Sequence, residues 1–365
     1  MTTSPTIEFH PLTVTEVRPE TDESVSITLD VPAELADRFV HRPGQHVVVR
    51  RQLGGEDVRR SYSICTAPGE GIRIGVKRIP DGAFSTWATT ELAAGDVLEV
   101  MAPIGEFQSV ETGGQPRNVV LVAAGSGITP LLAMATAILR DEPASSVTLL
   151  YGNRTTRTIM FHEDLEALKN RYPERFRMIH VLSREPNQVP LFEGRIDGDK
   201  VRRLAATIID VGGIDQWYLC GPLTMVDELS ATLAELGVPA DRLHHELFFD
   251  QRIERPAEVD GRTGGGIEML VTIDGRTSTV WVDPDGPSLL DYARSVRAEV
   301  PFACKGGMCA TCKARVLEGQ VTMTRNYALT AAEIEAGMAL TCQSHPAPGT
   351  ERLVLDYDVH GGLGR

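Results

Sequence analysis

The sequence contains no apolar run that approaches the roughly 20 residues needed to span a bilayer. Its first residues, MTTSPTIEFHPLT, lack the charged and then apolar regions of a secretion signal. Positive charge is also scarce, with 36 Lys and Arg against 50 Asp and Glu and a net charge of −14. A nucleic-acid-binding protein would need a basic face. We therefore expect a cytoplasmic protein with no membrane or nucleic-acid partner, whose charge suits docking to a basic protein.

Cysteine is sparse, with only 6 in 365 residues, so the chain is neither small nor cysteine-dense as secreted disulfide scaffolds are. Cys304, Cys309 and Cys312 nevertheless form a C-x4-C-x2-C pattern, and Cys342 follows. This spacing is typical of a plant-type [2Fe–2S] cluster held by four thiolates. Zinc sites usually show two short cysteine hooks instead. A Rieske site would need a C-x-H element, and none precedes Cys342.

The cysteine loop also has suitable backbone chemistry. Gly306 and Gly307 permit unusual backbone angles, which let main-chain N–H groups approach the sulfur atoms. Such donors stabilise and tune a cluster of thiolates. The sequence therefore predicts a [2Fe–2S] cluster on Cys304, Cys309, Cys312 and Cys342.

The chain length predicts two or three domains. Residues 1–112 alternate apolar and polar residues in short runs separated by Pro-Gly turns, which favours an antiparallel β-barrel. The expected strands are Phe9–Val17, Ser24–Val31, Gln45–Arg50 and Gly71–Lys77. A helix is expected over Phe84–Leu92.

Several short motifs in this first domain suit a flavin. Arg60, Tyr62 and Ser63 form an R-x-Y-S run on a strand, so that Arg60 and Tyr62 share a face. There an Arg fork can grip a pyrophosphate while a ring packs on the isoalloxazine. An exposed Arg beside a half-buried Tyr is the simpler alternative. The further candidates are Val76, Lys77, Gly82, Phe84 and Ser85, the last three at a helix start that either binds phosphate or is an ordinary N-cap.

Residues 113–250 alternate strands and helices, which predicts a parallel sheet with crossover helices. Expected strands are Val119–Ala123, Val147–Tyr151, Arg177–Leu182 and Gln216–Cys220. Expected helices are Leu131–Arg140, Phe161–Asn170, Asp199–Ile209 and Leu223–Leu236.

A glycine loop after the first of these strands lacks two features of the usual dinucleotide fingerprint. Pro130 replaces the third glycine, and the acidic residue expected about 20 residues further on is absent. A proline is tolerated in the first turn of a helix. The loop, with Gly125, Gly127, Thr129 and Pro130, predicts either a nucleotide site or a plain strand-to-helix turn.

A second candidate nucleotide motif follows the last predicted strand, at the edge where such sheets bind ligands. It contains Cys220, Gly221, Pro222 and Met225. A buried, inert Cys220 is the alternative.

Residues 251–266 are polar and Gly-rich, which indicates a flexible linker. In residues 267–365, Asp274-Gly275 predicts a hairpin between Ile267–Ile273 and Thr277–Val282.

The order and spacing of these motifs resemble the ferredoxin–NADP reductase superfamily, and the C-terminal part resembles the β-grasp fold of plant-type ferredoxins. The three modules together are similar to the reductase components of multi-component oxygenases, and most similar to the reductase subunits of phenylacetyl-CoA epoxidases. That last resemblance rests on the residues around the cysteines, including Ala303–Gly307, Asn326-Tyr327 and Leu340–Gln343. It implies FAD, NADPH or NADH, and a [2Fe–2S] cluster.

The resemblance also implies individual roles. Ser63 is placed to hydrogen-bond flavin N5, with Tyr62 on one face of the ring and Phe248 on the other. Cys220 is placed near the nicotinamide, and Glu246, just before Phe248, is counted with the cofactor-binding residues. Ser183 and Arg184 match residues that hold the 2′-phosphate of NADPH, although a solvated pair is the alternative.

The chain also lacks an E-x-x-H motif, which a ferritin-like di-iron oxygenase site requires. We therefore expect a reductase whose electron acceptor is a separate oxygenase component. The alternatives are a reductase for another oxygenase, such as a Rieske or steroid hydroxylase, and a non-enzymatic electron carrier or redox sensor.

Overall fold

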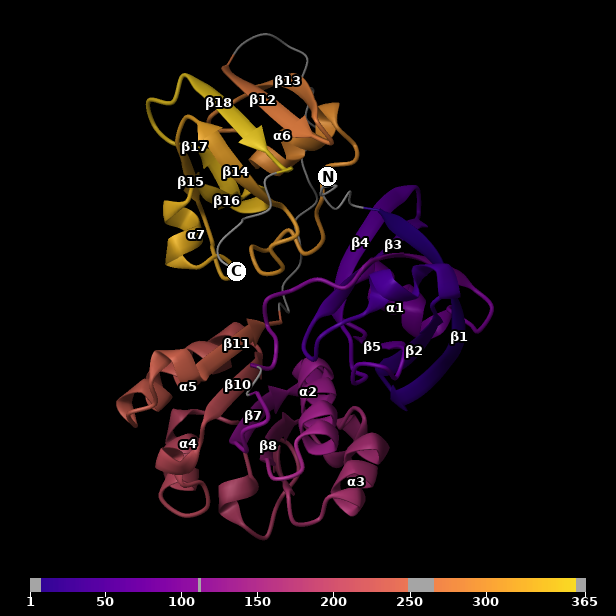
Figure 1. The fold of residues 1–365 in the computed structure, drawn as a ribbon, viewed down its shortest axis with the longest axis vertical. Helices are drawn as coiled ribbons and strands as arrows, with labels where there is room; N and C mark the ends of the chain where they lie inside the picture. Colours follow the sequence, from indigo (N-terminus) through magenta and orange to yellow (C-terminus); the bar gives the residue numbers. More distant parts are fainter. Residues whose placement is uncertain (1–7, 111–112, 249–265, 359–365) are drawn as a thin grey trace. The chain divides into compact units, whose positions relative to one another are not determined.

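The computed structural model describes residues 8–110, 113–248 and 266–358 (Figure 1). The larger of two compact units contains His10–Val58 and the chain from Tyr62 to residue 248. The smaller contains residues 266–358, together with Phe9 and Arg59–Ser61. Except for Gly266, the predicted linker lies outside the described residues. No described helix is long and apolar enough to cross a membrane.

The first part of the larger unit is a six-stranded sheet in the order β4-β3-β6-β1-β2-β5. Alternation places one face inside, and residues such as Leu12, Ile27 and Ile74 are fully buried there. β1 with β2, β2 with β5 and β3 with β6 pair antiparallel, which confirms the predicted antiparallel domain. The elements are β1 (Phe9–Thr21), β2 (Ser24–Asp30), β3 (His46–Leu53), β4 (Glu56–Ser63), β5 (Ile72–Lys77), α1 (Ala83–Thr90) and β6 (Val97–Met101).

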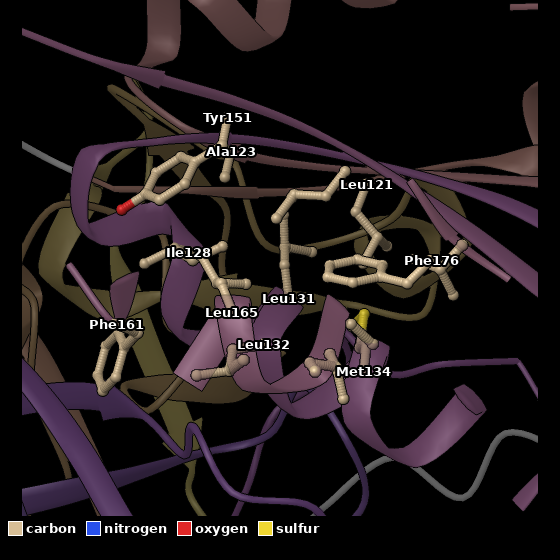
Figure 2. Packing of buried hydrophobic residues seen from close by; sticks show 14 of the residues in the cluster. Leu121, Ala123, Ile128, Leu131, Leu132, Met134, Tyr151, Phe161, Leu165 and Phe176 are labelled. Atoms are coloured by element: carbon tan, nitrogen blue, oxygen red, sulfur yellow. The ribbon is translucent and has the colours of Figure 1, made fainter. Parts of the chain in front are cut away.

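The second part is a parallel sheet, as predicted. It has five strands in the order β11-β10-β7-β8-β9, and its edge strand β11 was not predicted. Figure 2 shows its core, where Leu131 of α2 packs near Leu121 of β7 and Phe176 of β9. The elements are β7 (Asn118–Ala124), α2 (Ile128–Asp141), β8 (Ser146–Asn153), α3 (His162–Arg171), β9 (Phe176–Leu182), α4 (Gly198–Ala205), β10 (Gln216–Gly221), α5 (Leu223–Glu235) and β11 (Leu243–Leu247).

The smaller unit is a mixed sheet in the order β13-β12-β18-β14-β16, with a two-stranded sheet β15-β17. Its predicted hairpin is present, and Asp274 and Gly275 both have positive φ, as a tight hairpin turn requires. The elements are β12 (Ile267–Ile273), β13 (Arg276–Val282), α6 (Leu289–Val296), β14 (Lys313–Glu318), β15 (Val321–Met323), α7 (Ala331–Glu335), β16 (Met338–Leu340), β17 (Ser344–Pro346) and β18 (Arg352–Asp356).

Candidate functional site

Three predicted residues from distant parts of the sequence meet in the larger unit. Ser63 ends β4, whereas Cys220 and Glu246 are paired neighbours on the parallel strands β10 and β11. The Ser63 hydroxyl donates to Glu246 Oε2 at 3.4 Å. The Cys220 thiol donates to the same oxygen at 3.9 Å. One carboxylate therefore joins the end of the first sheet to the carboxyl edge of the second.

Cys220 is kept in its protonated form by this environment. Its side chain is fully buried, and burial, reinforced by the charge of Glu246, raises the pKa of the thiol well above its usual value. A thiolate would be needed for nucleophilic attack or metal binding. Cys220 is thus suited to donate a hydrogen bond and to fill space, and not to react covalently.

The glycine loop lies directly beside Cys220. Gly125 has φ +55°, and a Cβ on Gly127 would lie 2.2 Å from the carbonyl oxygen of Cys220, so only glycine permits this approach. The loop then enters α2, whose first turn contains Pro130. No described side chain caps this helix N-terminus, so its N–H groups suit an anion such as a phosphate.

The segment after Cys220 holds Phe248 at the same edge. The Phe248 N–H donates to the carbonyl of Gly221 at 2.9 Å, and its partly buried ring packs on the core of the parallel sheet. Pro222 immediately precedes α5. A Cβ on Gly221 would lie 2.7 Å from Cε of Met225, so Met225 closes over the strand end.

The structure shows which of the residues predicted to bind flavin have side chains that are buried in the protein core. Val76 and Phe84 are buried in the core of the first sheet, with the Phe84 ring 5.5 Å from that of Tyr62. Val76 can therefore contact a cofactor through its main chain and not through its side chain. Ser85 is buried, accepting a hydrogen bond from Ile79 N at 3.2 Å and donating to Gly82 O at 3.3 Å.

Two further predicted residues, Arg60 and Lys77, lie on strands β4 and β5 of the first sheet. Arg60 lies on β4, two residues from Tyr62, and donates to the carbonyl of Arg59 at 2.7 Å. Lys77 ends β5, and its Nζ lies 3.5 Å from where a Cβ on Gly125 would be. Lys77 therefore faces the glycine loop.

Ser183 and Arg184 follow β9, beside the end of β8. Their N–H groups donate to the carbonyls of Asn153 and Arg154 at 2.9 and 2.8 Å. The structure thus brings Ser183 and Arg184 to the same sheet edge as the glycine loop. The Arg154 side chain itself forms an ion pair with Glu23, in the turn between β1 and β2.

The four cysteines of the smaller unit fall into two pairs. Hydrogen bonding to Cys309 raises the pKa of Cys304, and hydrogen bonding to Cys342 raises that of Cys312, so the thiols of each pair lie close together. Within the second pair the hydrogen bond raises the pKa of Cys312 and lowers that of Cys342.

This arrangement fits a two-iron cluster. Among the described residues, no group of three or more His, Cys, Asp or Glu side chains is arranged to hold a metal ion. The two thiol pairs would instead hold a two-iron cluster, with two cysteine ligands for each iron. Main-chain N–H groups also point at sulfur, and Gly306 N lies 3.3 Å from Cys304 Sγ. Gly307 N–H similarly favours the thiolate of Cys342.

The cysteine loop has a backbone conformation that its sequence did not reveal. Lys305 and Ala310 have φ values of 49° and 52°, which are uncommon outside glycine. Lys305 is fixed by an ion pair with Asp291 of α6 at 2.9 Å, and both side chains are largely buried. Asp291 carries no motif, so sequence inspection missed it.

Three family models match the chain. They describe an oxidoreductase FAD-binding domain over residues 12–109, an oxidoreductase NAD-binding domain over 121–230 and a 2Fe-2S iron-sulfur cluster binding domain over 271–347. These matches agree with the predicted cofactors: FAD, a nicotinamide nucleotide and a [2Fe–2S] cluster.

Similar proteins match over nearly the full length. One of the subunits of the 1,2-phenylacetyl-CoA epoxidase of Escherichia coli is 41% identical, covering 97% of this chain and 99% of that protein. The ferredoxin reductase component of 3-ketosteroid-9-alpha-monooxygenase from Rhodococcus rhodochrous is 31% identical, covering 95% and 96%. The solved structure of phthalate dioxygenase reductase has the same fold, with a TM-score of 0.56 and 22% identity over 95% of this chain and 98% of that one.

Proposed function

Because this chain belongs to the family of oxygenase reductase components that carry FAD-binding, NAD-binding and 2Fe-2S domains, we propose that its acceptor is the oxygenase component of a phenylacetyl-CoA 1,2-epoxidase. The chain is an oxidoreductase, and its electrons run from NAD(P)H through FAD and the cluster. When bound, the flavin accepts two electrons from NAD(P)H and releases them singly to the cluster, which takes one at a time. The 41% identity over nearly the whole chain supports this choice of acceptor.

In this proposal Glu246 organises the place where nicotinamide and flavin meet. Its carboxylate orients the Ser63 hydroxyl and the Cys220 thiol, which come from the two domains that bind the two rings. Both groups are neutral and each has a single hydrogen, so each donates either to Glu246 or, after it turns, to a ring nitrogen or an amide oxygen, without introducing a charge. Tyr62 and Phe248 supply the flat apolar surfaces on either side of the flavin.

The nucleotide is bound along the edge formed by the glycine loop, Lys77 and the Ser183-Arg184 pair. Arg184 supplies a guanidinium for a 2′-phosphate, so NADPH is preferred over NADH. The domain limits proposed from the sequence are 1–112 for FAD, 113–250 for NAD(P) and 267–365 for the cluster.

Stopped-flow reduction followed by reconstitution tests this function. NADPH should bleach the flavin before the cluster, faster than NADH at equal concentration. The reduced protein should then support phenylacetyl-CoA epoxidation by the purified oxygenase component, and not 3-ketosteroid hydroxylation. Turnover with only the steroid oxygenase would refute the proposed acceptor while leaving the reductase class intact. Absence of NAD(P)H oxidation would instead favour a passive electron carrier.

A further inference from the structure

Strand β5 forms one of the contacts between the two halves of the larger unit. Along β5, Ile72, Ile74 and Val76 are buried in the core of the first sheet. Arg73, Gly75 and Lys77 alternate with them and so point the other way. A Cβ on Gly75 would lie 2.7 Å from Cγ2 of Thr129 and 2.9 Å from Cζ of Phe161. This face of β5 therefore packs tightly against the glycine loop and the start of α3.

Asp164, in the first turn of α3, binds two arginines of the first sheet. Its Oδ1 accepts from Arg73 Nη2 at 2.9 Å, and its Oδ2 accepts from Arg18 Nη2 at 2.5 Å. The three side chains are between 18% and 33% exposed, so solvent screens this ion pairing only partly.

Glu20 connects the same two halves in the opposite direction, from the first sheet to the start of α3. Its side chain is 5% exposed and accepts from Arg18 Nη2 at 2.8 Å. Its Oε2 accepts from the backbone N–H of Phe161 at 3.0 Å, immediately before α3 begins. A carboxylate from the first sheet thus satisfies a donor at the helix N-terminus, where negative charge is favoured.

The geometry of Phe161 shows that this connection is tightly determined. Its side chain is fully buried, and its φ of 56° is unfavourable for a bulky residue. Such a conformation persists only where the surroundings fix it. Here the surroundings are the Glu20 hydrogen bond, the Gly75 contact and the Arg73 guanidinium, 5.4 Å from the ring centre.

We propose that Arg18, Glu20, Arg73 and Asp164, here called the β5–α3 clamp, are positioning residues for hydride transfer. The clamp fixes Arg73 at one end of the face of β5 that, two residues further along, touches Thr129 of the nucleotide loop. It thereby holds the nicotinamide in line with the flavin. This inference rests on the proposed function, because it needs both rings in the larger unit.

The test compares D164N with D22N. Asp22 pairs with Arg157 across the same two halves, but at 3.7 Å and with both side chains more than 85% exposed, so it is a matched control. The limiting rate constant for flavin reduction at saturating NADPH should fall about tenfold in D164N, since small misalignments strongly slow such steps. FAD content and the dissociation constant for NADPH should change little. D22N should match the unsubstituted protein, and D164E should recover part of the rate.

The outcomes separate positioning from stability. If D164N lowers the melting temperature but leaves the limiting rate constant intact, the clamp is merely structural and the proposal is wrong. If D164N does not fold, the limiting rate constant and the melting temperature are compared in R18Q instead. This variant retains the Arg73–Asp164 pair. If the unsubstituted protein is not reduced by NADPH or NADH, the proposed function fails instead.

Discussion

The two units of this protein use cysteine in opposite ways. In the larger unit Cys65 and Cys220 are each alone and buried, and burial raises the pKa of both thiols. In the smaller unit four cysteines lie in two pairs that receive backbone N–H groups. The same side chain is thus suited to donate a hydrogen bond in one place and is proposed to bind iron in the other. The difference lies in grouping, because four thiols that lie close together can share an iron–sulfur cluster and a single buried thiol cannot.

The largest effect is expected from breaking a thiol pair. C309S should lose the cluster, because one iron would keep a single cysteine ligand. Electron delivery to the oxygenase should fall to background, while NADPH-dependent dye reduction through the flavin should continue. Iron content, visible absorbance and dye reduction check this, with C65S as a thiol-loss control that keeps the cluster. Loss of dye reduction as well would contradict the independence of the two units.

The next effect concerns the carboxylate that joins Ser63 to Cys220. E246Q replaces an acceptor of two hydrogen bonds by an amide that also donates. Flavin reduction by NADPH should slow by about tenfold or more, as expected when a donor at a reacting ring is misplaced. The pKa of Cys220 should fall, because a neighbouring negative charge is removed.

Stopped-flow absorbance measures the rate of flavin reduction, and the ultraviolet absorbance of the thiolate against pH measures the pKa of Cys220. C220A retains Glu246 and Ser63, so it separates the contribution of the thiol. An unchanged rate in E246Q would remove Glu246 from the proposed site.

A smaller effect is expected where charge lies beside the paired cysteines. The Lys305–Asp291 ion pair places a compensated cation next to Cys304. D291N leaves the cation uncompensated, which stabilises the reduced and more negative cluster, so the midpoint potential should rise. K305M should lower it. Potentiometric titration followed by electron paramagnetic resonance distinguishes these shifts, and equal potentials in both variants would show that the pair only shapes the loop.

The comparison also explains what the sequence could predict. Three of the four predicted cluster ligands lie in one loop, so their spacing alone was enough to predict a [2Fe–2S] cluster, and the match to a 2Fe-2S iron-sulfur cluster binding domain agrees with that prediction. The clamp was not predicted, because Arg18 and Asp164 are 146 residues apart and neither belongs to a motif. Short elements such as β15, β17 and α7 were also missed, since three to five residues are too few to show a period.

The direction in which a side chain points is a second feature that the sequence motifs did not predict. Val76 and Phe84 belong to motifs that matched the family, and yet both side chains turn into the core of the first sheet. A motif fixes which residues occur near a ligand. The strand period then decides whether each of them presents a side chain or only its backbone.

The smallest effect at neutral pH is expected at Cys65. It tests whether a single buried cysteine stays protonated in the folded protein. Its thiol donates to the carbonyl of Arg73 at 3.2 Å, and burial raises its pKa from 9.0 to about 12. The folded protein keeps this proton longer than the unfolded chain does. Its contribution to stability is therefore complete below about pH 9 and is lost as the pH rises toward 12, by a few kcal/mol in total.

C65A should lose about 1–2 kcal/mol at pH 7, through the lost burial and hydrogen bond. Its free energy of unfolding should then decline less steeply than that of the unsubstituted protein between pH 9 and the alkaline limit, so the two curves converge. C65S keeps a hydroxyl that does not ionise in this range and should show the same shallow slope. Urea unfolding at a series of pH values measures both. Parallel curves would mean that the Cys65 thiol ionises as readily in the folded protein as in the unfolded chain, and burial alone would then not account for the contrast between the two sets of cysteines.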